Sequence, residues 1–300
     1  MIFSCGEALV DVFPDAVPDS VPGGGPMNVA IAAARLGAGA AFVGGISTDH
    51  FGDMLWSHIE ANGVDLSLSR RFAAPTARAI VEHVPELRFR FEGDGTADTL
   101  LDSIDHDVVR GRLNVVHGGT LGMFRGAAAD AYADLAASHD GLVSLDPNIR
   151  PQIIGDRAVW HGFHDRWLPH VDLYKGSDED LEWIWPDRTP EDSAAWLLDQ
   201  GVGAVIVTRG SDGLAILTRS GEAFAPAPVV EVVDTVGAGD TIVGVVLTSL
   251  VEHFEDDDAI DLSSLASPDW QRFAERAVTA AGITCSRAGA DVPHRHELDW

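Results

Sequence analysis

The chain has 300 residues, 46% of them hydrophobic, which is enough to bury the core of one large or two ordinary domains. Its 47 acidic residues outnumber 20 basic ones, and the net charge of -27 argues against nucleic acid or anionic lipid as partners. Adaptation to high salt and a plain preference for solubility both explain such a surface.

The first residues, "MIFSCGEALVDVFP", have no basic residues ahead of their apolar run and resemble a strand rather than a signal peptide. No apolar run reaches the length of about 18 residues that a membrane helix needs. Cys5 and Cys285 are too few and too far apart for a disulfide framework. We therefore expect a cytoplasmic protein with no membrane span.

Apolar runs alternate with amphipathic segments through most of the chain. We expect strands at residues 2–7, 40–45, 113–119, 142–146, 171–176 and 204–210, and helices at residues 26–37, 51–63, 127–139 and 191–201. Each helix ends at or near a glycine, a common helix terminator. Apolar strands separated by helices predict an α/β fold, with a mainly parallel central sheet and helices on both faces.

Two stretches depart from this pattern. Residues 77–95 alternate apolar and polar side chains about a short connection, which predicts a β-hairpin. That hairpin serves either as a small β lid over the carboxyl edge of the main sheet or as a plain edge hairpin. The acidic residues 255–269 are expected to form a solvated connection.

The segment "DTVGAGDTIVGVVL" places Gly237, Ala238 and Gly239 ahead of a long apolar helix that begins near Asp240. Small residues at a helix start leave backbone N–H groups open to an anion, and the helix dipole favours it. A carboxylate inside a phosphate-binding turn suits a general base of phosphoryl transfer. The alternative is an Asp cap on a glycine-rich turn.

A second glycine cluster lies in "VPGGGPMNVAIAAARLG". It places Gly24 and Gly25 at a helix start and Asn28 one turn further on. Glycine backbone permits close approach of a ligand, and an amide side chain both donates to and accepts from a hydroxyl-rich molecule. Ordinary helix entry through Gly and Pro explains the same residues.

These two segments resemble the two signatures of the ribokinase-like (PfkB) carbohydrate kinases. The phrases "GEALVDVFP", "DPNIRP", "KGSDEDLE", "VTRGSDG" and "TCSRAGADVP" fall where the fructokinase and 2-keto-3-deoxygluconate kinase branch has comparable motifs. The resemblance covers nearly the whole chain. It implies one ribokinase-like kinase domain over residues 1–300, with a β lid contributed by about 12–22 and 74–98. It also implies transfer of the γ-phosphoryl group of ATP to a sugar hydroxyl.

The resemblance also implies roles for individual residues. Asp240 looks like the catalytic base, with the backbone of Gly237, Ala238 and Gly239 as the anion hole. Sugar contacts are implied for Asp11, Gly24, Gly25, Asn28 and Arg150, and ATP contacts for Ser177, Thr208, Gly210 and Gly213. Asp180 would organise the Mg²⁺ shell through water. Asp234, with the loop at Gly289, resembles a site for a monovalent cation such as K⁺.

Three of these residues have simpler explanations. Asp11 is alternatively a strand-end acid that bonds nearby backbone, and Asp180 an exposed helix cap. Arg150 is alternatively the partner of Asp146 in a buried ion pair. No assembly is specified by the sequence, although a homodimer is compatible with it.

The choice of acceptor rests on the hairpin. Relatives that bind 2-keto-3-deoxygluconate typically place Tyr and Arg before a "GTAD"-like segment, whereas Glu92 and Gly93 stand at those positions here. An acid repels a substrate carboxylate, which favours a neutral ketose, fructose first, unless Arg90 takes the place through a shifted register. A 2-keto-3-deoxygluconate kinase and a catalytically silent sugar sensor remain the alternatives. Val278 replaces an Asn near the adenine of many relatives, which leaves the nucleotide preference open.

The histidines of "HGFH" (161–164) and "HRH" (294–296) have spacings found in metal sites. The sequence offers no third ligand beside either pair. We expect both to be surface residues.

Overall fold

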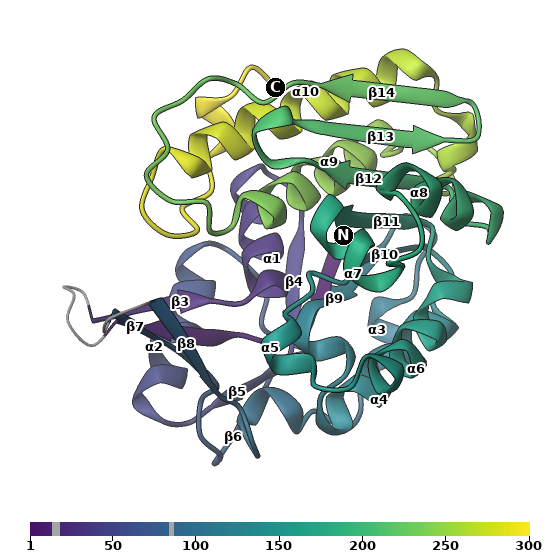
Figure 1. Ribbon diagram of the computed structural model, residues 1–300. Coiled ribbons are helices and arrows are strands. Elements are labelled where there is room, and N and C mark those ends of the chain that lie inside the picture. Colours follow the sequence, from purple (N-terminus) through teal and green to yellow (C-terminus); the bar gives the residue numbers. More distant parts are fainter. Residues whose placement is uncertain (14–18, 84–86) are drawn as a thin grey trace.

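An eight-stranded sheet and a four-stranded sheet organise the chain (Figure 1). The computed structural model describes residues 1–13, 19–83 and 87–300. The large sheet has the order β14-β13-β12-β11-β10-β9-β1-β4. Its strands are β1 (Ile2–Cys5), β4 (Ala40–Val43), β9 (Val115–Gly119), β10 (Leu142–Asp146), β11 (Leu173–Ser177), β12 (Ala204–Thr208), β13 (Leu214–Thr218) and β14 (Gly221–Ala225). All pair in parallel except β13 and β14, so the predicted mainly parallel sheet is confirmed.

Both faces of this sheet are covered by helices, as expected from its continuous apolar strands. Successive residues of β1 and of β9 belong to different cores: Ile2 and Val115 pack on one face, Phe3 and Val116 on the other. The helices α1 (Gly25–Arg35), α9 (Ala238–His253) and α10 (Ser267–Cys285) supply the first core. The helices α4 (Gly126–Ser138), α6 (Arg157–Trp167), α7 (Asp178–Ile184) and α8 (Pro190–Asp199) supply the second.

The second sheet projects beside the carboxyl edge of the first (Figure 1). Its order is β3-β2-β7-β8, from β2 (Leu9–Val12), β3 (Ser20–Gly23), β7 (Arg78–His83) and β8 (Leu87–Glu92). The antiparallel pairing of β7 with β8 confirms the predicted hairpin. Helix α2 (His50–Ala61) packs against β2 and β3, and the short strands β5 (Gly45–Ser47) and β6 (Arg70–Phe72) pair nearby. Residues 14–18 and 84–86 of the predicted lid lie outside the described residues.

Some elements differ from the expectation. The acidic stretch 255–269 is exposed at its start, but Leu262 and Leu265 are buried, and α10 begins within it. The predicted elements did not include the antiparallel strands β13 and β14 or the short helices α3 (His106–Val109) and α5 (Pro151–Ile154). No helix in the described part of the chain combines the length and hydropathy that crossing a membrane requires.

Candidate active site

The candidate site centres on the start of α9, at the carboxyl edge of the parallel strands. Gly237 caps this helix in the left-handed conformation, with φ 78°. A Cβ on Gly237 would lie 2.5 Å from the Cβ of Ala290, so the turn and the C-terminal loop are packed too closely for any side chain. The small residues therefore let a second loop pack against the helix start, and the methyl group of Ala238 is the largest side chain in the turn.

Asp240 lies in the first turn of α9 and is 8% exposed. Its Oδ2 accepts a hydrogen bond of 2.8 Å from Nδ2 of Asn28, a buried residue of α1. Burial raises the pKa of Asp240, and the bond from Asn28 and the charges of Lys175 and Arg150 oppose that rise. The two predicted glycine-rich segments thus meet through a buried carboxylate and an amide, although 212 residues separate them.

Gly25 has no side chain, which leaves open the space in front of the Asp240 carboxylate. A Cβ on Gly25 would lie 3.3 Å from Oδ1 of Asp240, 2.8 Å from Oγ1 of Thr120 and 3.3 Å from Nδ2 of Asn148. Thr120 and Asn148 are the non-glycine residues with positive φ (48° and 40°) in the described part of the chain. Strained backbone tends to gather at functional sites. We therefore include both residues in the candidate site, although no sequence motif singled out either one.

Asp11 faces the same region from β2. Its Oδ2 lies against Gly23, on which a Cβ would come within 2.7 Å. Burial raises the pKa of Asp11 to about 6, with Arg150 opposing and Asp234 adding to the rise. Gly24 has φ 121°, and a Cβ there would meet the carbonyl oxygen of Glu7 at 2.5 Å. Close packing of backbone, rather than helix entry alone, therefore explains the glycine at position 24.

Lys175, the single lysine of the chain, is buried in the middle of β11. Its Nζ lies 3.0 Å from Oδ2 of Asp146 at the end of β10, and both side chains are almost inaccessible to water. A Cβ on Gly239 would lie 3.1 Å from this Nζ. The ammonium group therefore stands directly beside the glycine turn of α9. No sequence motif pointed to a role for this residue in the site.

Arg150 was expected either at the ligand or in a buried pair with Asp146. The second alternative is wrong, because Asp146 pairs with Lys175 and Arg150 is exposed. Arg150 donates to the carbonyl oxygen of Ile149 at 3.0 Å. Its charge nevertheless lowers the pKa of both Asp11 and Asp240, which places it at the mouth of the site.

Asp180 and Ser177 form a capping box at the start of α7. Ser177 Oγ accepts from Asp180 N at 3.0 Å, and Asp180 Oδ2 accepts from Ser177 N at 2.9 Å. Asp180 Oδ1 also accepts from the backbone N–H of Ile149 at 2.8 Å. The acid is therefore a helix cap, as the alternative expected, but it is buried rather than exposed. It ties α7 to the loop that follows β10.

The residues predicted to contact ATP lie at the ends of β11 and β12 and in the turn that follows β12. Thr208 ends β12 and pairs in register with Ser177 of β11. Gly210 and Gly213 follow in a turn, both with positive φ (50° and 99°). A Cβ on Gly213 would lie 2.1 Å from the carbonyl oxygen of Ala225, whereas nothing lies within 4 Å of one on Gly210. Gly213 is thus required by packing, and Gly210 leaves open space at the strand end.

Asp234 and Gly289 are in contact, as the sequence analysis expected. Oδ2 of Asp234 accepts from the N–H of Gly289 at 2.9 Å, and Oδ1 accepts from the N–H of Val236 at 3.1 Å. The pair joins the segment before α9 to the C-terminal loop. The same loop packs on Gly237 through Ala290.

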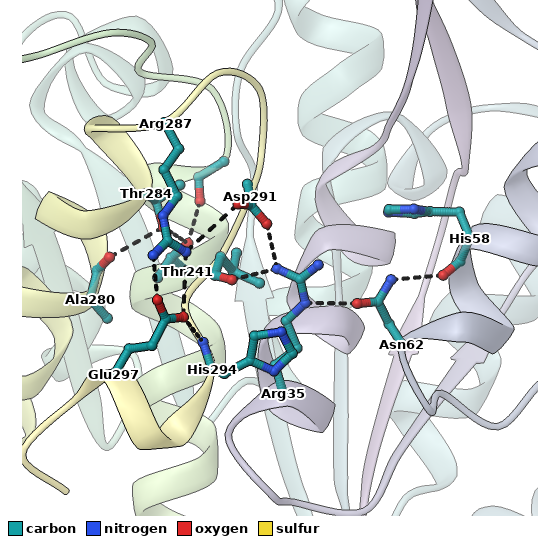
Figure 2. A network of polar contacts seen from close by, with 12 residues as sticks. Arg35, His58, Asn62, Thr241, Ala280, Thr284, Arg287, Asp291, His294 and Glu297 are labelled. Carbon is teal, nitrogen blue, oxygen red and sulfur yellow. Dashed lines mark hydrogen bonds and ion pairs between the residues drawn. The ribbon is translucent and has the colours of Figure 1, made fainter.

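A polar network holds this C-terminal loop in place (Figure 2). Arg35 of α1 binds Asp291 at 2.7 Å and Asn62 at 2.7 Å. Thr241 and Thr284 share a buried hydrogen bond of 2.9 Å that joins the start of α9 to the end of α10. The glycine turn is therefore supported on both sides by side chains that themselves lie outside the site.

Glu92 does not face the proposed sugar site, contrary to the expectation on which the choice of acceptor rested. Asp11, Ala79 and Phe91 are directly paired across β2, β7 and β8, whereas Glu92 pairs with Arg78, which in turn pairs with Val10. Paired residues point to the same face of a sheet, so Glu92 lies on the face opposite Asp11. There it binds Arg78 at 2.5 Å and also Arg90. Neither Glu92 nor Arg90 faces the region of Asp11.

Instead, Gly93 lies beside a different arginine. Its carbonyl oxygen accepts a hydrogen bond from Arg125, which also forms an ion pair of 2.6 Å with Asp98. Both side chains of that pair are largely buried. Arg125 therefore fixes the end of β8 against the start of α4.

The "HGFH" histidines were expected at the surface without a third ligand. That expectation is wrong for His164, which is 1% exposed and bonds the hydroxyl of Tyr174 at 3.1 Å. Burial lowers the pKa of His164 to about 4. Exposed Asp165 also brings a carboxylate within 4.8 Å of ring nitrogens of His161 and His164. His294 and His296 are exposed, as expected.

Known proteins resemble this chain over almost its full length. Residues 18–296 match the family described as pfkB family carbohydrate kinase. The fructokinase of Rhizobium leguminosarum bv. trifolii is 34% identical over 261 residues, which cover 83% of this chain and 79% of that protein.

Two crystal structures have the same fold. The fructokinase of Xylella fastidiosa with bound ATP has a TM-score of 0.84 at 27% identity and covers 96% of this chain and 93% of its own. The aminoimidazole riboside kinase of Salmonella enterica, complexed with aminoimidazole riboside and an ATP analogue, has a TM-score of 0.84 at 25% identity. That comparison covers 99% of this chain and 98% of the other.

Proposed function

The chain belongs to the pfkB family of carbohydrate kinases, and from this premise we propose that it transfers the γ-phosphoryl group of ATP to the primary hydroxyl of fructose. The ribokinase-like α/β fold goes with this membership. One observation carries the proposal. A buried carboxylate, Asp240, lies in the first turn of α9 beside the Gly-Ala-Gly turn and is held by Asn28 from the other glycine-rich segment.

Asp240 acts as the general base in this proposal. It accepts the proton of the attacking sugar hydroxyl, while the backbone N–H groups of Gly237, Ala238 and Gly239 stabilise charge on the transferring group. Burial raises the pKa of Asp240, which strengthens it as a base. Asp11 and Asn28, with the backbone of Gly24 and Gly25, offer the polar groups that bind the sugar hydroxyls.

ATP is proposed to bind along the ends of β11 and β12, beside Ser177, Thr208, Gly210 and Gly213. A magnesium ion bound with ATP would neutralise its phosphate oxygens. Asp180 fits such an ion through water, because each of its oxygens already accepts a backbone N–H and Mg²⁺ keeps several waters in protein sites.

Asp234 and the loop at Gly289 are proposed to hold a monovalent cation such as K⁺. The carboxylate of Asp234 already bonds Gly289, and the same loop packs on Gly237 through Ala290. A cation there would stabilise the turn that forms the anion hole. The Asp234 carboxylate fits a cation, while its oxygens each accept one backbone N–H.

The second sheet is proposed to act as the lid of the site. Asp11 lies on one face of it, in line with Ala79 and Phe91 across the neighbouring strands. Closure of that face over the sugar would exclude water, which competes with the sugar for the phosphoryl group.

Fructose is favoured by the Rhizobium relative and by the acids around the site. Asp11, Asp234 and Asp240 repel an anionic sugar more than a neutral one. Glu92 does not contribute to this repulsion, because it lies on the face of the second sheet opposite Asp11. One observation favours 2-keto-3-deoxygluconate instead: Arg150 is exposed and its charge reaches Asp11, so it could bind a carboxylate.

An assay of ADP release with fructose, 2-keto-3-deoxygluconate, ribose and adenosine separates these substrates. We expect the highest kcat/KM with fructose. Turnover of the keto acid alone would refute the proposal and would point to Arg150 as the carboxylate-binding residue.

Asp240→Asn separates a kinase from a sugar sensor. We expect kcat to fall by about three orders of magnitude, because the variant lacks the base that accepts the sugar proton. Fructose affinity, measured by calorimetry, should change little. A variant that phosphorylates fructose at the parent rate would refute the role of Asp240.

A further inference from the structure

The side chain of Lys175 is a permanent cation buried within the proposed transfer site. It is the single lysine among the 20 basic residues of the chain. A lysine is seldom buried completely unless it is paired, and Lys175 is 5% exposed. Its pKa is raised, because the nearby carboxylates, Asp146 foremost, outweigh the burial that would lower it. The ammonium group therefore stays charged throughout the pH range in which enzymes work.

Three acids from three elements surround this ammonium. Asp146 ends β10, Asp180 lies in the first turn of α7, and Asp240 lies in α9; all three acids are buried, and each raises the pKa of Lys175. His117 of β9 also lies near, but burial and Lys175 lower its pKa to about 3, so it is neutral. The exposed Arg150 acts on Asp240 from the mouth of the site.

We propose that Lys175 is a positioning residue for phosphoryl transfer, which keeps Asp240 ionised and supplies a fixed positive charge behind the glycine turn. This inference rests on the proposed kinase function. Nζ of Lys175 lies 3.0 Å from Asp146, and it would lie 3.1 Å from a Cβ on Gly239, so the ammonium touches both the acid and the turn.

An ammonium group has three donors, and the ion pair with Asp146 uses one of them. The group thus retains donors on the side of the turn. Without this cation, three buried acids would surround the point where the phosphates of ATP must enter. Repulsion among them would raise the pKa of Asp240 and would oppose the approach of a negatively charged phosphoryl group.

A purely structural role predicts a different result from a positioning role. If Lys175 only neutralised Asp146, removing the charge of Asp146 would make Lys175 dispensable. If Lys175 acts on Asp240 and on the turn, its loss is costly even when Asp146 is neutral. The variants Lys175→Met, Asp146→Asn and the double variant, together with the parent, form the cycle that distinguishes the two roles.

The measurements are kcat, KM for ATP and fructose, and kcat as a function of pH, each after urea unfolding has shown that the variant is folded. In the Asp146→Asn background, we expect Lys175→Met to lower kcat by about 100-fold, the effect of losing one preorganised charge-stabilising group. We also expect the acidic limb of the kcat profile to move up by about one pH unit or more. KM for fructose should change little.

Lys175→Arg is the matched control, because it keeps the charge but changes the geometry. It should keep the acidic limb near its parental pH even if kcat falls. The inference is overturned if Lys175→Met changes neither kcat nor the acidic limb in the Asp146→Asn background. A parent that phosphorylates no sugar would instead overturn the proposed function, and this inference with it.

Discussion

A substitution of Gly237 tests whether the glycine turn excludes any side chain at this position. Its φ of 78° is costly for any residue with a Cβ, and the Cβ of an alanine there would lie 2.5 Å from Ala290 Cβ and 2.9 Å from Ala290 Cα. Left-handed backbone costs a non-glycine residue roughly 1–2 kcal/mol. Overpacking against a fixed neighbour adds about 1–3 kcal/mol. Gly237→Ala should therefore lower the free energy of unfolding by about 2–5 kcal/mol.

Gly63 provides the matched control. Its φ of 76° is nearly the same as that of Gly237, yet nothing lies within 4 Å of a Cβ placed on it. Gly63→Ala should therefore show the backbone cost alone, about 1–2 kcal/mol. The difference between the two variants, measured by urea unfolding, isolates the contact with Ala290.

Activity should separate the two glycines further. Relief of the contact in Gly237→Ala must move either the turn or Ala290, and Ala290 adjoins the residue that binds Asp234. We expect kcat to fall at least tenfold, an estimate from the sensitivity of preorganised sites to small displacements, while Gly63→Ala keeps the parental kcat. Equal destabilisation of both variants, together with an unchanged kcat for Gly237→Ala, would refute the packing argument.

Three further predictions concern charge. Asn28→Ala removes a hydrogen bond to the buried Asp240, worth about 1.5–3 kcal/mol, so the acidic limb of the kcat profile should move up by about 1–2 pH units; an unmoved limb contradicts this. Burial raises the pKa of Glu7 to about 8. The folded state therefore retains a proton that the unfolded chain loses above pH 4.5, and stability falls as the pH rises from 4.5 to 8. Glu7→Gln should remove that loss of stability. Relative to the parent, the unfolding free energy of the variant should therefore rise by about 4–5 kcal/mol between pH 4.5 and pH 8. Urea unfolding of both proteins at pH 5 and pH 9 measures this difference. Finally, the net charge of -27 predicts a higher thermal midpoint in molar KCl than in dilute buffer, and no gain would exclude acid repulsion as a limit on stability.

Local sequence patterns predicted the elements that form the catalytic edge. The strand 142–146 and the helix 26–37 were placed within two residues of β10 and α1, because apolar runs and terminal glycines are local signals. The contact between the two glycine-rich segments followed from family resemblance rather than from the residues alone. Helix α10 was missed, although Trp270, Phe273 and Ala277 have helical spacing along its buried face.

The face of the second sheet on which each side chain lies could not be predicted in the same way. Whether Glu92 or Phe91 faces Asp11 depends on the register of β8 against β7, and a shift of one residue exchanges the two faces. Alternation in the sequence shows that two faces exist, but it does not show which one meets the rest of the molecule. Glu92 carries the expected negative charge, but it lies on the face of the sheet that is turned away from Asp11.

The ion pair of Lys175 with Asp146 illustrates the remaining difficulty. The two residues are 29 positions apart and meet because their parallel strands end side by side, at a distance that no spacing in the sequence encodes. Composition nevertheless carried a signal. In a chain whose other basic residues are all arginines, a lone lysine within an apolar strand points to a specific role rather than to a place on the surface. An ammonium group is a compact point charge, whereas a guanidinium is a wider planar group, which is a physical reason for lysine rather than arginine beside the glycine turn.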